Sequence, residues 1–171
     1  MHSNKTFTSE SFKNKDFTGE SFSGTVFDDC SFEGCNLSNV DLLQASLQGV
    51  VFKKCKIMGV DFSKTNDFLI DVSFDNSMIS MSVFSNLKLK NTVFNSCEIT
   101  DCDFFKTDLT KAVFKDSDLR GSRFQDCNLT STSFRTARNY VIDPNKNLLK
   151  KTKVSMPEAV GLLASFDLEI K

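Results

Sequence analysis

Large apolar residues recur at every fifth position along most of the chain. One series runs from Phe7 to Phe62 and a second from Leu69 to Phe134, and every member is Phe, Leu or Ile. This period does not fit an α-helix, in which each step of five rotates the side chain by about 140°. It does not fit a flat strand either, because an odd spacing alternates between the two faces. The chain must therefore turn within every repeat, which predicts a solenoid with short straight sides and frequent corners.

The positions around the large residues follow the same period. A small or compact residue precedes most of the large ones by two and would be a second inward position. Six of the seven glycines follow a large residue by two, where the backbone must turn. All six cysteines stand at the small inward position: Cys30, Cys35, Cys55, Cys97, Cys102 and Cys127. They are interpreted as small buried residues rather than zinc ligands, because their spacing only repeats the period and puts consecutive members on adjacent faces.

Two features depart from the regular pattern. The first four small positions are Lys5, Glu10, Lys15 and Glu20, whose charges do not suit a narrow dry interior, so we expect an irregular or capping first coil. Two extra residues also separate the two series, within the sequence SKTNDFLIDV. We expect this slip, at residues 63–68, to form a local bulge between two segments of one solenoid.

Units such as CNLSNVDLLQA and KAVFKDSDLRGSRFQDCNLTSTSF resemble the pentapeptide-repeat family, whose units read roughly small, polar, Leu or Phe, polar, polar. The resemblance covers about Lys5 to Arg135. It implies an all-β fold, a right-handed four-sided (quadrilateral) β-helix with four repeats in each coil, so that residues twenty apart stack on one face. Such stacks are quasi-one-dimensional and need a cap at each end.

The chain is expected to have two parts, a β-helix over residues 1–135 and a capping and dimerisation tail over residues 136–171. Ser155 to Glu158 have the pattern of a capping box, which predicts a short helix to about Ala164. Apolar and acidic residues then alternate as in a strand. The apolar residues of the tail are expected to cap the last coil, and the family resemblance favours that they also join two copies into a homodimer: Val160, Leu162, Leu163, Phe166, Leu168 and Ile170.

Composition and charge exclude several classes of function. With 21 basic and 22 acidic residues, the chain does not indicate direct binding to nucleic acid by phosphate neutralisation. It contains neither an apolar run of ~18 residues nor a secretory signal, which favours a cytoplasmic protein without a membrane partner. Its single histidine, His2, and its dispersed glycines offer no catalytic or phosphate-binding arrangement. The chain is therefore predicted not to be an enzyme, with no catalytic, cofactor-binding or metal-binding residues.

The acidic residues are the best candidates for a partner-binding surface. Residues 1–134 carry 14 basic and 18 acidic side chains, whereas residues 135–171 carry seven and four, so the coil is mildly acidic and the tail basic. Ordinary solvated surface is the alternative, because Lys and Arg are interspersed. Outward Val93, Val113 and Phe105 are candidates for an added apolar contact. The predicted negative strip consists of Asp41 stacked on Asp61, Glu98 stacked on Asp118, Asp101 and Asp103 at the adjoining corner, and Asp108 beyond.

Within the family, the chain resembles the Qnr quinolone-resistance proteins and the microcin-immunity protein McbG. The likeness includes the long two-segment repeat region and the tail motifs Ile142-Asp143-Pro144 and Pro157-Glu158-Ala159. It implies a dimeric DNA mimic that binds DNA gyrase or topoisomerase IV, protecting the enzyme from drugs or toxins by occupying its basic DNA-binding saddle. The chain departs from Qnr proteins with loops bulging from the coil, since it has only a two-residue slip. The alternative function is a structural or scaffolding module that binds another protein partner.

Overall fold

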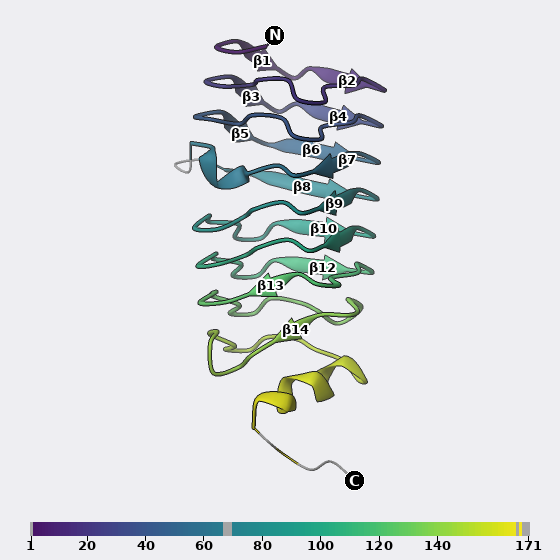
Figure 1. The fold of residues 1–171 in the computed structure, drawn as a ribbon, viewed down its shortest axis with the longest axis vertical. Helices are drawn as coiled ribbons and strands as arrows, with labels where there is room; N and C mark the ends of the chain where they lie inside the picture. The colour runs from purple at the N-terminus through teal and green to yellow at the C-terminus, as the bar shows by residue number, and fades with distance from the viewer. Residues whose placement is uncertain (1, 67–69, 167, 169–171) are drawn as a thin grey trace.

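The chain forms a rod of about seven stacked coils in the computed structural model, which describes residues 2–66, 70–166 and 168. The coil axis runs along the length of the rod, with the N-terminus at one end and the C-terminal segment beyond the other (Figure 1). Strand pairs are parallel, and most partners are twenty residues apart, as Phe7 and Phe27 are. The predicted all-β solenoid, a four-sided β-helix, is confirmed.

Each coil contributes to four faces, which we number in chain order. Isolated bridges continue the pairing where a face has no regular strand, as between Asp103 and Arg123 on face 4. Face 1 contains β1 (Thr6–Thr8), β3 (Val26–Asp28) and β5 (Ser46–Gln48). Face 2 contains β2 (Ser11–Lys13), β4 (Ser31–Glu33), β6 (Val50–Lys53), β8 (Val72–Asp75), β10 (Val93–Asn95) and β12 (Val113–Lys115). Face 3 contains β7 (Lys56–Met58), β9 (Met78–Ser80) and β11 (Glu98–Thr100), and face 4 contains the helical turn η1 (Phe62–Lys64), β13 (Arg123–Phe124) and β14 (Val141–Ile142).

Two ladders of phenylalanine rings fill the interior from opposite faces. The ladders meet edge to face, as Phe84 and Phe94 do at an interplanar angle of 90°. Aromatic rings favour both offset stacking and edge-to-face contact, so the spacing of the coils explains why Phe recurs here. On face 2, centroids 4.7–5.3 Å apart join Phe12, Phe32, Phe52, Phe74, Phe94, Phe114 and Phe134. On face 4, centroids 4.7–5.0 Å apart join Phe62, Phe84, Phe104 and Phe124.

The small inward position does more than fill space, because its hydroxyl and thiol groups tie the coils together. The Ser117 hydroxyl accepts a hydrogen bond from the Cys97 N–H at 3.0 Å and lies 3.2 Å from the Phe94 carbonyl, to which it donates. The Thr107 hydroxyl donates to the Phe84 carbonyl at 2.9 Å. Backbone groups at the inner corners are thereby satisfied without water, which a dry interior requires.

The register locates the two extra residues that separate the two repeat series. The Asn66 N–H bonds to the Ala45 carbonyl, twenty-one residues earlier, as in the regular coils. In the next strand, however, Val50 pairs with Val72, twenty-two residues later instead of twenty. The longer coil therefore gains its two residues between Asn66 and Asp71, and residues 67–69 at its centre lie outside the described part of the chain.

The N-terminal coil is more regular than the charged residues suggested. β1 and β2 pair in register with β3 and β4, and Lys5, Glu10 and Lys15 point to solvent. The interior of this coil is covered instead by His2, whose ring lies 5.5 Å from that of Phe17. The charges are accommodated because the outermost coil has no neighbour above it to bury them.

Beyond the repeats, one further coil stacks on the rod before the chain ends. Leu148 bridges to Asn128 and Lys153 to Ser133, so the stacked backbone continues past residue 135, where the repeat pattern ends. A 3-10 helix, η3 (Glu158–Phe166), then lies against β14.

The C-terminal segment differs from the predicted helix and strand. The Ser155 hydroxyl donates to the Arg135 carbonyl, so its side chain is engaged by the coil and does not form the expected capping box. The helix begins at Glu158 and has 3-10 rather than α geometry. Phe166 belongs to this helix and Leu168 has no regular structure, while Ile170 lies outside the described residues.

Candidate protein-interaction surface

The seven acidic residues predicted to form a strip lie on three faces of the rod. Asp41, Asp61 and Asp103 belong to one column on face 4, in which Val83 bridges to both Asp61 and Asp103. Glu98 and Asp118 are neighbours on face 3. Asp101 occupies the corner between faces 3 and 4, and Asp108 lies on face 1 beside Lys88 and Asn128. Six of the seven therefore surround one edge of the rod, and Asp108 is separate from them.

Five of these carboxylates have a structural role that the sequence reading missed. Each accepts a hydrogen bond at Oδ1 from the backbone N–H two residues later, which closes an Asx turn at a corner of the coil. The donors are Leu43, Ser63, Phe105, Thr110 and Arg120, with N–O distances of 3.0–3.1 Å to Asp41, Asp61, Asp103, Asp108 and Asp118 respectively. A signal existed in the sequence, because Asn and Ser occupy the same repeat position elsewhere and close the same turn, as Asn36 does with Ser38.

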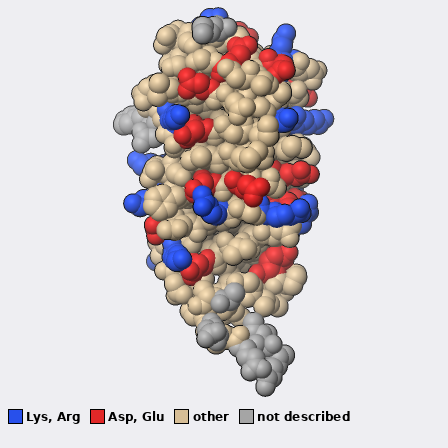
Figure 2. Space-filling view, viewed as in Figure 1, with Lys and Arg blue, Asp and Glu red and all other residues tan. Residues whose placement is uncertain are grey.

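Basic side chains neutralise several of the same acids. Arg123 lies 2.8 Å from Asp103 and Lys90 lies 3.3 Å from Asp108. Figure 2 shows acidic and basic side chains interspersed along the visible face of the rod. Among the described residues, only Glu98 and Asp101 of the seven acids form neither an Asx turn nor an ion pair, and both are exposed.

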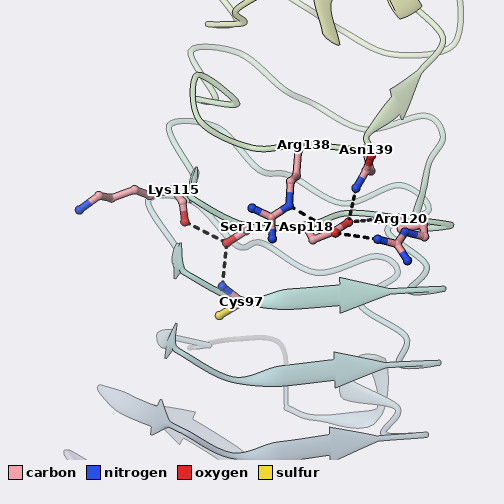
Figure 3. Close-up of polar contacts among 7 residues, drawn as sticks. All are labelled: Cys97, Lys115, Ser117, Asp118, Arg120, Arg138 and Asn139. Carbon is pink, nitrogen blue, oxygen red and sulfur yellow. Dashed lines mark hydrogen bonds and ion pairs between the residues drawn. The ribbon is translucent and has the colours of Figure 1, made fainter. Parts of the chain in front are cut away.

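Asp118 is the most enclosed of these acids and joins the last repeat coil to the coil beyond it (Figure 3). Its carboxylate accepts hydrogen bonds from Arg120 at 3.1 Å, Arg138 at 3.4 Å and Asn139 at 3.0 Å. Burial acts to raise the pKa of Asp118, but the hydrogen bonds from Asn139 and Arg120 and the nearby guanidinium charges outweigh it, so the pKa is lowered. Asp118 is therefore a structural clamp rather than a free negative charge.

Exposed apolar residues mark a surface that the sequence reading did not identify. Met78 and Met81 are 49% and 58% exposed, and both lie beside the free carboxylates. Met78 pairs in register with Glu98, and the Met81 N–H bonds to the Thr100 carbonyl, directly before Asp101. The predicted apolar candidates lie elsewhere. Val93 and Val113 are on face 2, and Phe105 on face 4 has the Lys106 ammonium 5.0 Å from its ring centroid.

The apolar residues predicted for dimerisation are divided between the rod and solvent. Leu162 packs against the end of the core and is half-buried. Val160, Leu163, Phe166 and Leu168 are exposed, between 36% and 59%. The sixth predicted residue, Ile170, is outside the described part of the chain. η3 thus presents apolar side chains outward while Leu162 anchors it to the coil.

The six cysteines are buried and free of disulfide bonds. Burial raises the pKa of the Cys102 thiol to about 12 and that of Cys55, Cys97 and Cys127 to about 11. A thiol with such a pKa remains protonated at neutral pH and is a poor nucleophile or metal ligand. Within the described residues, no group of three or more His, Cys, Asp or Glu side chains is placed to hold a metal ion.

The interior of the coil offers little room for a ligand. One space of about 10 Å³, lined by apolar side chains such as Phe32 and Phe52, has roughly the volume of a single water probe. In the part of the chain that the structure describes, no helix is both long and apolar enough to cross a membrane.

Comparison with known proteins identifies the repeat. A sequence model described as a pentapeptide repeat region matches residues 5–79, and a second, described as eight copies of pentapeptide repeats, matches residues 97–135. The chain belongs to the pentapeptide-repeat family. No curated protein matches this pentapeptide-repeat protein in sequence.

Solved structures give the same fold over the full length of the rod. The protein is similar to a trypsin-treated variant of QnrB1, described as a plasmid-mediated fluoroquinolone resistance protein, with a TM-score of 0.57 and 21% identity over 99% of this chain and 92% of that one. For a second trypsin-treated variant of QnrB1, the TM-score is 0.51 and the identity 20%, over 99% of this chain and 93% of that one. At this identity the likeness demonstrates the shared fold.

Proposed function

We propose that the protein is a non-catalytic, DNA-mimicking modulator of a type II topoisomerase, DNA gyrase or topoisomerase IV, and counters a quinolone or a toxin. The observation that carries this proposal is the full-length likeness to QnrB1, a fluoroquinolone resistance protein. Support also comes from the exposed carboxylates of Asp41, Glu98 and Asp101 around the edge between faces 3 and 4, where they would meet a basic DNA-binding surface. Such a partner places the protein in the cytoplasm of a bacterium.

The charge pattern defines how this rod would act. Arg123 and Arg138 pair with Asp103 and Asp118 on this edge. Among the described residues, Asp41, Glu98 and Asp101 have no cation paired with them, and Glu98 and Asp101 lie together in the middle of the rod. Attraction to the topoisomerase would therefore be local, centred on the middle coils, and would add to shape complementarity along the rod. Salt should weaken it, since exposed charges are screened over ~8 Å at physiological ionic strength.

In this proposal the tail, residues 136–171, has a second function, the formation of a homodimer. Val160, Leu163 and Phe166 are exposed on η3, although apolar side chains of this size are usually buried. A twofold axis at this end would bury them against the same surface of a second copy and give a longer rod. In this proposal, residues 1–135 dock on the topoisomerase and residues 136–171 join the two copies.

The proposal is tested with purified protein in gyrase supercoiling assays, with and without ciprofloxacin. The expected result is that micromolar protein inhibits supercoiling or relieves inhibition by the drug. A double variant, Glu98→Gln with Asp101→Asn, should reduce either effect, and more strongly at low salt. Asp29→Asn is the matched control, because Asp29 has the same positive-φ corner conformation as Asp101 at another edge of the rod.

The outcome separates this function from the alternative, a scaffolding module for another protein partner. A protein without effect on supercoiling or on drug inhibition of either topoisomerase contradicts the topoisomerase proposal. Equal losses in Asp29→Asn and in the double variant would contradict the assignment of the edge between faces 3 and 4. The scaffold alternative has its own support in the filled interior of the described coils, where the space lined by Phe32 and Phe52 measures only about 10 Å³.

A further inference from the structure

The corner between faces 3 and 4 contains one residue, Met81, whose type is unusual for its backbone conformation. Seven residues stack in this corner, and each has φ between +49° and +71°, the left-handed region that disfavours most side chains. Six of them are residues that tolerate this conformation and the seventh is Met81: Gly19, Asn39, Gly59, Met81, Asp101, Gly121 and Asn139. Throughout the described residues, Met81 is the only apolar side chain at a positive φ. Burial of the Met81 side chain does not offset the backbone strain, since this side chain is 58% exposed.

Met81 belongs to a larger apolar surface that bends around the corner. Met78, on face 3, is 49% exposed and precedes Met81 by three residues. Met58, half-buried on the coil above, is paired with Ser80 and is therefore a diagonal neighbour of Met78. Val83 continues the surface onto face 4. We call Met58, Met78, Met81 and Val83 the methionine patch.

Negative charge borders the methionine patch on the side toward the C-terminus. Glu98 lies beside Met78 in the parallel register, and Asp101 follows Met81 in the corner column. Both carboxylates are exposed and, among the described residues, have no cation paired with them. Asp61 flanks Val83 on the other side. The patch is thus apolar at its centre, with Glu98 and Asp101 on its C-terminal side and both Lys56, beside Met78, and Asp61, beside Val83, on its N-terminal side.

We propose that the methionine patch is a docking surface for a cationic protein segment that inserts an apolar side chain between Met78 and Met81. Flexible, polarisable methionine side chains adapt to the shape of an inserted residue, and the free carboxylates at the rim attract Lys or Arg that flank it. The strained backbone at Met81 is retained because it holds the thioether out of the corner, where Asn or Gly would present no apolar group. This inference rests on the proposed function only in taking the partner to be a protein.

The test uses the full chain with the methionine methyl groups labelled with carbon-13, titrated with a synthetic amphipathic peptide of Leu and Lys. The Met78 and Met81 methyl signals should shift in a saturable way, while Met156, which is 70% exposed in the tail, should not. A peptide with Glu in place of Lys should not bind. Signals of Met78 and Met81 that stay in place, shifts of equal size at Met156, or equal binding of the acidic peptide would each overturn the proposal.

Two variants distinguish docking from a structural role. Met81→Asn removes the thioether, so it should raise the dissociation constant for the Leu/Lys peptide about tenfold or more. Because Asn tolerates a positive φ better than Met does, the same change should relieve backbone strain and raise the Tm by about 2–4 °C. Leu148→Ser, a change of similar exposure on face 1, should leave peptide binding unchanged. Unchanged peptide binding in Met81→Asn would overturn the proposal. Because the peptide assay contains no topoisomerase, its failure and the failure of gyrase inhibition are separate results.

Discussion

Replacing Phe94 by Ala tests whether the phenylalanine ladders hold the rod together. The Phe94 side chain is 0% exposed. Its ring stacks on Phe74 at 5.0 Å and on Phe114 at 4.7 Å. It also meets the edges of Phe84 and Phe104 from the opposite ladder, at 6.2 and 6.3 Å. The substitution would remove all four ring contacts and leave a cavity that the surrounding coils cannot close.

The expected cost follows from these contacts. A fully buried Phe→Ala change lowers the free energy of unfolding by about 3–5 kcal/mol. Phe94→Leu should cost only about 1–2 kcal/mol, because Leu occupies the same repeat position in other coils and only the aromatic pairing and part of the volume are lost. Phe12→Ala should also cost about 1–2 kcal/mol, since Phe12 is partly exposed at the rod end and has a stacked neighbour, Phe32, on one side only.

Urea unfolding followed by far-ultraviolet circular dichroism measures the three variants against the parent protein. The predicted order of destabilisation is Phe94→Ala first, with Phe94→Leu and Phe12→Ala much smaller. Equal losses for Phe94→Ala and Phe12→Ala would refute the reasoning, because the cost would then not depend on burial within the ladder. A Phe94→Leu variant as unstable as Phe94→Ala would show that ring stacking outweighs volume.

Three further predictions concern the corners, the thiols and the clamp. Gly121→Ala should lower the free energy of unfolding by about 1–2 kcal/mol, because φ is +71° and the added methyl group would meet the Asp101 carboxylate; chemical denaturation measures this, and an unchanged midpoint would contradict it. The Cys102 thiol, with its pKa raised to about 12, should resist alkylation at pH 8 in native protein and react after unfolding; modification of the native protein, read by mass spectrometry, would contradict the burial. Asp118→Asn should cost about 1–3 kcal/mol at neutral pH. Because the pKa of Asp118 is lowered in the folded protein, its carboxylate stabilises the fold above the unfolded pKa of 3.8, and this stabilisation is lost as the pH falls through the folded pKa. The free energies of unfolding of parent and variant, measured in urea titrations, should therefore converge at acid pH.

The five-residue period was sufficient to predict the fold, because each large residue has a single inward place in a turning coil. Phe94 and Leu109 illustrate this, since both are fully buried where the pattern puts them. The C-terminal coil could not be predicted in the same way. Tyr140 and Ile142 close the interior there without the period, and their burial follows from stacking on the coil above.

The candidate surface was less accessible to sequence reasoning than the fold. The position of an acid along the repeat predicts its column but not the use of its oxygens. Asp103, for example, closes a turn with Phe105 and pairs with Arg123, so the same residue type serves structure at one corner and is free at another. The methionine patch was missed for a different reason, since Met81 stands where the pattern calls for Gly, Asn or Asp, and only its φ shows the departure as strain.

Competition with DNA tests the proposed function most directly. Gyrase is bound to a fluorescent duplex, the full-length protein is added, and fluorescence anisotropy reports how much duplex stays bound. If the rod occupies the DNA-binding surface, anisotropy should fall in a saturable way, and the Glu98→Gln, Asp101→Asn double variant should require more protein than Asp29→Asn does. Duplex that stays fully bound at saturating protein, both to gyrase and, in the same assay, to topoisomerase IV, would contradict DNA mimicry.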